Sequence, residues 1–227
     1  MARLKIYEFT AYLHDFNPMI SRRFQVVADM PLRKLAFILM ILFEMRGGHL
    51  YEFNVPSFVD PTYSKRLVLP FELEEGGFPV DPKVVYSNMF NEKVNDVFLV
   101  ENQQATFEYD YGDGWVIRLQ LTGIIKKEDS RRHYPLLLEG KGYGIIEDVG
   151  GTGGLTRFME AYTNKKGDEY KELRRWSGLS SFKILKFNHL DMQQRIRYLP
   201  TIYEKTQVRN EDPKDNDLNY LMHYYRF

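Results

Sequence analysis

The apolar run at residues 35–43 is the feature that most constrains the fold of this chain. All nine residues of the run are hydrophobic, so a helix built from them has no polar stripe to turn toward water. Pro31 suits the first turn of such a helix and Asp29 suits its N-cap. We therefore predict a helix over residues 32–45 that ends at Gly47-Gly48. A bilayer span needs about 20 residues, so this helix must be covered by the rest of a globular fold.

Strand-like segments flank this helix on both sides. Large and polar residues alternate along residues 5–13 and again along residues 20–27, which predicts a β-hairpin. Further strands are expected at residues 49–55 and 66–73, which gives a β-β-α-β start. Helices are expected in the C-terminal third, at residues 155–163, 168–176 and 189–199. We predict an α+β fold with a mixed or antiparallel sheet and a buried central helix after the first hairpin.

The chain has the length of one domain followed by a polar segment. Residues 1–203 can bury a substantial core as a single α+β domain. Between residues 204 and 217 the sequence carries eight charges in fourteen positions, which predicts a linker. Residues 218–227 regain Leu, Met, Tyr and Phe and are predicted to form a tail that docks on the body or on a partner.

Composition excludes several classes of site. The 31 basic and 31 acidic residues balance, so attraction to a polyanion or a membrane surface requires a local patch. The absence of cysteine removes disulfides, thiol nucleophiles and cysteine-ligated zinc. The N-terminus lacks the pattern of a signal peptide, so we expect a cytoplasmic protein without a membrane segment. The nucleophile-elbow, zinc-protease and nucleotide-binding fingerprints are absent from the sequence.

An aromatic hairpin is predicted near the middle of the chain. A two-residue loop at Asp113-Gly114 would mix polar and apolar side chains on both faces, whereas the loop Gly112-Asp113-Gly114 separates them. In this register Gly114 takes the left-handed position and Asp113 lies at the exposed tip. The expected pairs are Tyr111 with Trp115, Tyr109 with Ile117, Phe107 with Leu119 and Glu108 with Arg118.

Acids and glycines gather between this hairpin and the next helix. Four of the acids can supply hard oxygen ligands for Mg²⁺ or Mn²⁺: Asp110, Asp113, Glu147 and Asp148. The competing interpretation makes Asp113 a turn residue, makes Asp110 a residue that caps or solvates a strand end, and places Glu147-Asp148 at a helix start, where the dipole favours anions. The run Gly150-Gly151-Thr152-Gly153-Gly154 lacks the Lys of a phosphate-binding loop. The predicted binding residues are Tyr109, Asp110, Tyr111, Asp113, Trp115, Glu147, Asp148, Gly150 and Gly151.

Basic and histidine side chains offer two further possibilities. Arg22 and Arg23, with the segment Arg131-Arg132-His133, can form a patch for a nucleic-acid backbone, although solvated surface charge is the commoner explanation. His49 and His133 can take part in acid–base chemistry. For His49, between a diglycine and an aromatic strand, a structural role is favoured.

Four motifs together resemble the plasmid pRiA4b ORF-3-like family, whose members are often labelled passenger proteins of insertion elements. The motifs are Pro18-Met19-Ile20-Ser21-Arg22-Arg23, His49-Leu50-Tyr51-Glu52-Phe53, Tyr109-Asp110-Tyr111-Gly112-Asp113-Gly114-Trp115 and Glu147-Asp148-Val149-Gly150-Gly151. Their order and spacing match across about residues 3 to 200. The resemblance implies an α+β fold and a prokaryotic, plasmid or mobile-element setting, with no established reaction. Members often have a histidine where this chain has Ile117, and cysteines and paired prolines where it has Tyr143-Gly144-Ile145-Ile146.

Two hypotheses for function follow. The first is a non-catalytic interaction module without a cofactor, which holds a peptide, protein or nucleic acid through the aromatic hairpin and the glycine loop. These two segments are expected to lie next to each other and form one surface. The alternative is a divalent-metal-dependent hydrolase, nuclease-like, with the four carboxylates as ligands. Convergence of those carboxylates on one point would favour the enzyme, and carboxylates bonded to backbone N–H groups would favour the module.

Overall fold

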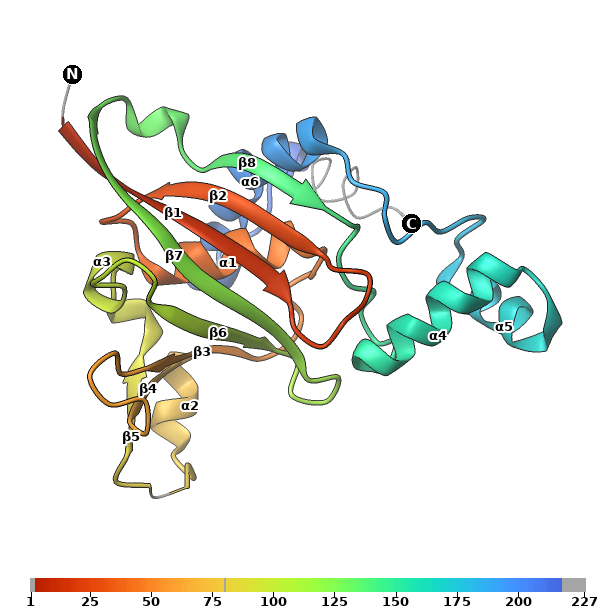
Figure 1. The fold of residues 1–227 in the computed structure, drawn as a ribbon, viewed down its shortest axis with the longest axis horizontal. Helices are drawn as coiled ribbons and strands as arrows, with labels where there is room; N and C mark the ends of the chain where they lie inside the picture. The colour runs from red at the N-terminus through yellow and green to blue at the C-terminus, as the bar shows by residue number, and fades with distance from the viewer. Residues whose placement is uncertain (1–2, 80, 218–227) are drawn as a thin grey trace.

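The computed structural model describes residues 3–79 and 81–217, and its centre is one eight-stranded sheet (Figure 1). The strands are β1 (Arg3–Leu13), β2 (Ser21–Val27), β3 (Tyr51–Pro56), β4 (Ser64–Val68), β5 (Val84–Asn88), β6 (Gln104–Tyr109), β7 (Trp115–Glu128) and β8 (Leu136–Lys141). Their order is β5-β4-β3-β6-β7-β1-β2-β8. Only the β4–β5 pair among these strands is parallel, so the predicted mixed sheet of an α+β fold is confirmed.

The helices lie partly on one side of this sheet and partly beside it. They are α1 (Leu32–Leu42), α2 (Pro70–Glu75), α3 (Val94–Val97), α4 (Gly151–Asn164), α5 (Gly167–Ser177) and α6 (His189–Tyr203). In Figure 1, α1 and α6 lie on the same side of the sheet, whereas α4 and α5 extend beside it. The predicted cluster of helices in the C-terminal third is confirmed by α4, α5 and α6. No helix within the described residues is long and apolar enough to cross a membrane.

Helix α1 forms the centre of the core, as its apolar sequence predicts. Every residue from Leu35 to Phe43 is fully buried, and the ring of Phe37 packs on that of Tyr203 from α6 at 5.5 Å. The predicted start at residue 32 is confirmed, whereas the predicted N-cap and the predicted C-terminal end are wrong. Pro31 takes the N-cap position, because the carboxylate of Asp29 instead accepts hydrogen bonds from Arg131 at 2.7 and 2.6 Å. The helix stops at Leu42 because the chain turns left-handed at Glu44, where φ is 63°.

The first hairpin packs its apolar face on α1 and leaves its other face polar. Strands β1 and β2 pair antiparallel, with Phe9 opposite Phe24. On the opposite face Glu8 accepts hydrogen bonds from Arg23 at 3.0 Å and from Gln25 at 2.7 Å. Such alternation is typical of an antiparallel sheet with one solvated face.

Arg22 is buried in the core, so the predicted basic patch does not form as expected. Its side chain is 1% exposed, and its guanidinium lies over the rings of Phe43 and Phe187 at 5.2 and 4.4 Å. The five carbonyls that accept its N–H groups are those of Ser21, Leu42, Lys141, Gly142 and Tyr143. Burial lowers the pKa of Arg22 to about 9. Arg22 therefore stays charged at neutral pH and ties β2 to the chain after β8.

The predicted register of the aromatic hairpin is wrong by two residues. Strands β6 and β7 pair Tyr109 with Trp115 and Phe107 with Ile117, so the loop spans residues 110–114. The longer loop arises because Asp110 itself turns left-handed, with φ of 57°, and its carbonyl accepts the N–H of Gly114 at 2.6 Å. Gly114 takes the expected left-handed conformation, with φ of 66°. A shift of two residues keeps every side chain on its predicted face.

The strand predicted at residues 66–73 ends earlier than expected. Strand β4 stops at Val68, and Pro70 begins α2. Proline is favoured at the first helical position because its missing N–H has no partner there in any case. The segment after Val68 therefore forms a short helix in place of the last part of the predicted strand.

The helical layer extends past the boundary expected at residue 203. Residues Glu204–Val208 continue from α6 as a further helical turn. Glu204 is 7% exposed and accepts a hydrogen bond from Arg33 of α1 at 2.7 Å. This part of the predicted linker thus packs on the body. The predicted tail at residues 218–227 lies outside the described residues.

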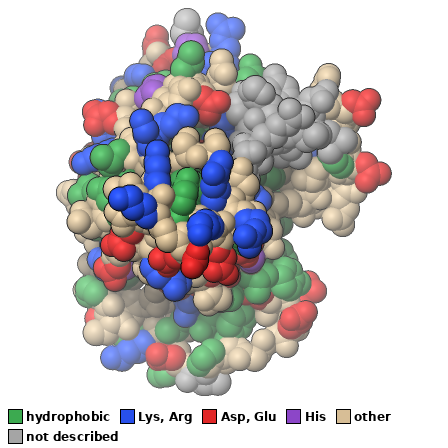
Figure 2. All heavy atoms as spheres, turned by 90° about the vertical axis from the view of Figure 1, so that its right-hand side faces the viewer, with side chains coloured by type: hydrophobic (Ala, Val, Ile, Leu, Met, Phe, Trp, Pro, Cys, Tyr) green, Lys and Arg blue, Asp and Glu red, His purple; other side chains and the backbone are tan. Residues whose placement is uncertain are grey.

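Charge is distributed unevenly over the molecule. Residues 151–188, which contain α4 and α5, carry eight Lys and Arg against four Asp and Glu. Figure 2 shows basic side chains gathered on the face of the molecule at this end, with acidic side chains below them. Because the whole chain has a formal net charge of zero, the rest of it carries an equal excess of negative charge.

Candidate functional site

Three side chains from distant parts of the sequence meet beside the end of β6. His49 lies two residues before the start of β3, and Asp110 directly follows β6. Because Tyr51 pairs with Tyr109, this pairing brings His49 and Asp110 together. His49 Nδ1 lies 3.5 Å from Asp110 Oδ2, and His49 Nε2 lies 3.6 Å from Asp148 Oδ1. One ligand atom from each residue can be chosen so that all three lie within 4.8 Å of one another.

Asp110 is held in place by its own turn. Its Oδ1 accepts the backbone N–H groups of Gly112 at 3.0 Å and Asp113 at 3.3 Å. Such an Asx turn compensates for the left-handed backbone at this residue. The side chain of Asp110 is 11% exposed, and its second oxygen, Oδ2, remains directed at His49.

The hairpin turn is joined to the glycine run by Asp113. Asp113 Oδ2 accepts the N–H of Gly150 at 3.2 Å. Gly151 has φ of +64°, and a Cβ on it would lie 2.4 Å from the carbonyl oxygen of Asp113. Only glycine permits this close approach. The hairpin and the start of α4 therefore lie next to each other, as the sequence predicts.

Glu147 is bonded to Tyr109 and to the segment after α1, and it is not part of the three-residue cluster. Its Oε1 accepts hydrogen bonds from the Tyr109 hydroxyl and from the backbone N–H of Arg46, both at 2.5 Å. The Tyr109 hydroxyl in turn accepts the N–H groups of Gly47 at 3.0 Å and Gly48 at 3.2 Å. Burial, and next the bond to Glu147, raise the pKa of Tyr109 above its usual value. Tyr109 is therefore a neutral phenol that organises the diglycine turn.

The aromatic side chains of the hairpin do not form a common stacking surface. Tyr109 and Trp115 are buried in the core, whereas Tyr111 is 50% exposed. The Tyr111 hydroxyl donates to Glu72 of α2 at 3.3 Å. Of the three aromatic residues predicted for binding, Tyr111 alone can offer a ring to a partner.

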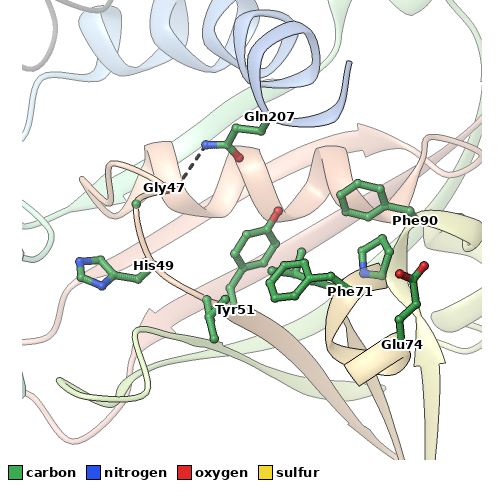
Figure 3. Close-up of a pocket in the computed structure, with 11 residues that line it drawn as sticks. Gly47, His49, Tyr51, Phe71, Glu74, Phe90 and Gln207 are labelled. Atoms are coloured by element: carbon green, nitrogen blue, oxygen red, sulfur yellow. Dashed lines mark hydrogen bonds between the residues drawn. The ribbon is translucent and has the colours of Figure 1, made fainter. Parts of the chain in front are cut away.

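A cavity of about 650 Å³ opens between the diglycine turn and α2. Its walls are Gly47, Gly48, His49, Leu50, Tyr51, Leu69, Pro70, Phe71, Glu74, Phe90 and Gln207. Figure 3 shows the rings of Tyr51, Phe71 and Phe90 lining the cavity, with the carboxylate of Glu74 at one end. At the other end Gln207 donates a hydrogen bond to the carbonyl of Gly47 at 3.2 Å. The cavity thus combines aromatic walls with one acidic group.

The structure separates the predicted site residues into three groups. Asp110 and Asp148 meet at His49, Asp113 binds the glycine run, and Glu147 binds Tyr109 and Arg46. His49 was assigned a structural role from the sequence, and the cavity residues of α2 were not predicted. In the sequence His49 stands out only by its place in a motif, two residues before Tyr51. This place predicts a position beside Asp110 only when the pairing of β3 with β6 is known.

Comparisons with known proteins agree with this fold. The sequence matches the family described as "Plasmid pRiA4b ORF-3-like protein" over residues 5–192. It is 26% identical over 187 residues to the uncharacterized protein y4hQ of Sinorhizobium fredii, covering 81% of this chain and 87% of that protein. The crystal structure of a protein of unknown function, MM3350 from Methanosarcina mazei Go1, has a similar fold. Its TM-score is 0.69 at 23% identity, with 84% of this chain and 98% of that chain covered.

Proposed function

Because the chain belongs to the plasmid pRiA4b ORF-3-like family, whose matched relatives carry no assigned reaction, we propose a function from the geometry of its cavity. We propose that the chain is a non-catalytic binding module. Its ligand is a peptide segment that places an apolar side chain between Tyr51, Phe71 and Phe90 and a positive charge near Glu74. The plasmid or mobile-element setting and the cytoplasmic location stay predictions.

The shape and lining of the cavity support an apolar side chain as the inserted group. Ligand cavities in proteins commonly have volumes of roughly 300–1,000 Å³ and apolar walls with a few placed polar groups. The cavity of about 650 Å³ falls within this range. Phe71 is 44% exposed, so its ring gains apolar contact when a ligand covers it.

The charge of the cavity supports a cationic rather than an anionic ligand. Glu74 is the charged carboxylate of the lining, to which neither Lys nor Arg contributes within residues 3–79 and 81–217. A second acid of α2, Glu72, accepts a hydrogen bond from Tyr111. A nucleic-acid backbone would be repelled here, whereas Lys or Arg of a peptide would be attracted.

The bonding of the predicted acids supports the non-catalytic alternative. Asp110, Asp113 and Glu147 each accept at least one backbone N–H. Carboxylates used in this way hold turns together. The divalent-metal hydrolase with Asp110, Asp113, Glu147 and Asp148 as joint ligands would require Asp113 and Glu147 to leave these partners.

Peptide selection followed by calorimetry tests the proposal. Peptides selected from a random library on the purified protein are expected to share an apolar residue near a Lys or Arg. Phe71→Ala should weaken the binding of such a peptide about tenfold, which corresponds to about 1.4 kcal/mol, and Glu74→Gln about fivefold, which corresponds to about 1 kcal/mol.

Two exposed positions outside the cavity lining provide matched controls. Phe58→Ala removes a ring that is 57% exposed, and Glu75→Gln removes the neighbouring acid of α2. Both variants should bind the peptide as the wild type does. Failure to select any peptide, or equal losses in the cavity and control variants, would contradict the proposal. Metal-dependent cleavage of DNA or RNA, lost in Asp110→Ala and Asp148→Ala, would instead support the hydrolase.

A further inference from the structure

We propose that His49, Asp110 and Asp148 bind one divalent ion of a first-row transition metal, such as Zn²⁺ or Mn²⁺. This set differs from the four carboxylates suggested by the sequence. It adds an imidazole and omits Asp113 and Glu147, whose oxygens hold backbone amides of the glycine run and of Arg46. The inference does not depend on the proposed peptide ligand.

The spacing of the three side chains suits a small cation. Ligand atoms about 2.0–2.2 Å from an ion lie roughly 3–3.6 Å from one another when they are adjacent in its coordination shell. The His49–Asp110 separation of 3.5 Å and the His49–Asp148 separation of 3.6 Å meet this condition. The two separations involve different ring nitrogens, so one carboxylate must rotate toward the nitrogen that binds the ion.

Two of the ligands are fixed and the third is free to adjust. The amides of Gly112 and Asp113 hold Asp110 through Oδ1 and leave Oδ2 for the ion. The His49 ring packs edge-on against Tyr109, with the ring centroids 5.6 Å apart. The side chain of Asp148 is 70% exposed and can therefore supply the rotation. Fixed ligand orientation of this kind raises metal affinity.

The donor set indicates the class of metal. One imidazole nitrogen and two carboxylate oxygens favour first-row transition-metal ions such as Zn²⁺ and Mn²⁺ over Ca²⁺, which prefers six to eight oxygens. The two carboxylates carry a joint charge of −2, which a divalent ion neutralises. Three protein ligands leave further coordination positions for water or for another ligand.

The metal site lies beside the cavity and can be tested apart from it. Figure 3 shows the His49 imidazole directed away from the rings of Tyr51 and Phe71. Removal of the imidazole should therefore weaken metal binding while the aromatic walls of the cavity stay intact.

Metal titration of the full chain tests the site directly. Calorimetry with ZnCl₂ and MnCl₂ at neutral pH is expected to show one ion per chain, and Co²⁺ should give the visible absorption of a nitrogen- and oxygen-ligated ion. His49→Gln and Asp148→Asn should each weaken binding by at least about tenfold and change the Co²⁺ spectrum. Asp148→Asn alters an exposed side chain and should leave the fold unchanged.

His14→Gln provides the matched control. His14 also pairs with a carboxylate, that of Asp15, at 3.2 Å, but a second acid does not complete a cluster with them among the described residues. This variant should bind the metal as the wild type does. Absence of stoichiometric binding of all three metals would overturn the proposal. So would binding that His49→Gln and Asp148→Asn leave unchanged. Peptide binding that persists after the metal is chelated would support the proposed function independently of the metal site. Metal binding by a protein for which no peptide ligand is found would support the metal site independently of the proposed function.

Discussion

Substitution of Gly151 by alanine should break the contact between the hairpin turn and the start of α4. Gly151 has φ of +64°, and an added Cβ would lie 2.4 Å from the carbonyl oxygen of Asp113. Alanine in the left-handed region costs about 1 kcal/mol. The contact must also lengthen by about 1 Å to become ordinary, which overpacking data place at about 1–3 kcal/mol.

These contributions predict that Gly151→Ala lowers the free energy of unfolding by about 2–4 kcal/mol. The separation also breaks the hydrogen bond from Gly150 N–H to Asp113 Oδ2. Most domains have only about 5–15 kcal/mol of stability, so the loss is large enough to measure. Urea unfolding followed by circular dichroism, with equal slopes in both proteins, gives the difference.

Gly153→Ala is the matched control in the same run. Its added Cβ has no atom within 4 Å, and the residue lies inside the first turn of α4. Alanine is a better helix former than glycine by up to about 1 kcal/mol, so this variant should be as stable as the wild type or more stable. A Gly151→Ala protein as stable as the wild type, or equal destabilisation by both substitutions, would refute the reasoning.

Two further predictions concern buried polar side chains. Arg22→Met should lower the free energy of unfolding by about 3–5 kcal/mol because it leaves buried carbonyls without donors. The control Arg23→Met, on the exposed face, should lower it by at most about 1 kcal/mol. Equal losses of the two variants in urea unfolding would argue against the role of Arg22. The raised pKa of Tyr109 means that the fold favours the neutral phenol, so the stabilisation is present below pH 10 and is lost as the pH rises above the phenol's ordinary value. Tyr109→Phe should therefore reduce the loss of stability between about pH 10 and 12; the slope of the urea midpoint against pH measures this.

Local patterns in the sequence predict much of the fold. The run without a polar stripe at residues 35–43 identifies the buried helix, and alternation identifies both strands of the first hairpin. The C-terminal helices follow from helical spacing. These features depend on a few neighbouring residues, which the sequence displays directly.

The buried position of Arg22 was available from the same alternation. Arg22 has the same parity as Phe24 and Val26, which face the core. The charge of Arg22 predicts a position on the surface, whereas the alternation of side chains along the strand predicts a position in the interior. The interior prevails because five carbonyls are placed to receive the guanidinium, an arrangement that requires the distant segment after β8.

The site residues show where sequence reasoning stops. The neighbouring positions of the hairpin turn and the glycine run were predicted, but the bonds that separate Asp113 and Glu147 from Asp110 and Asp148 were not. Those bonds depend on atomic positions in two loops. The role of His49 depends on the pairing of β3 with β6, which joins segments more than fifty positions apart.

The uneven charge of the molecule has a consequence for its behaviour in solution. A chain whose positive and negative groups cancel in number, yet are unevenly distributed, has an electric dipole. At low ionic strength it should adhere to a cation-exchange resin at neutral pH through the α4–α5 end, although its sequence pI is about 7.0. About 0.15 M salt shortens the screening length to about 8 Å, and the orientation that this dipole imposes should then largely vanish.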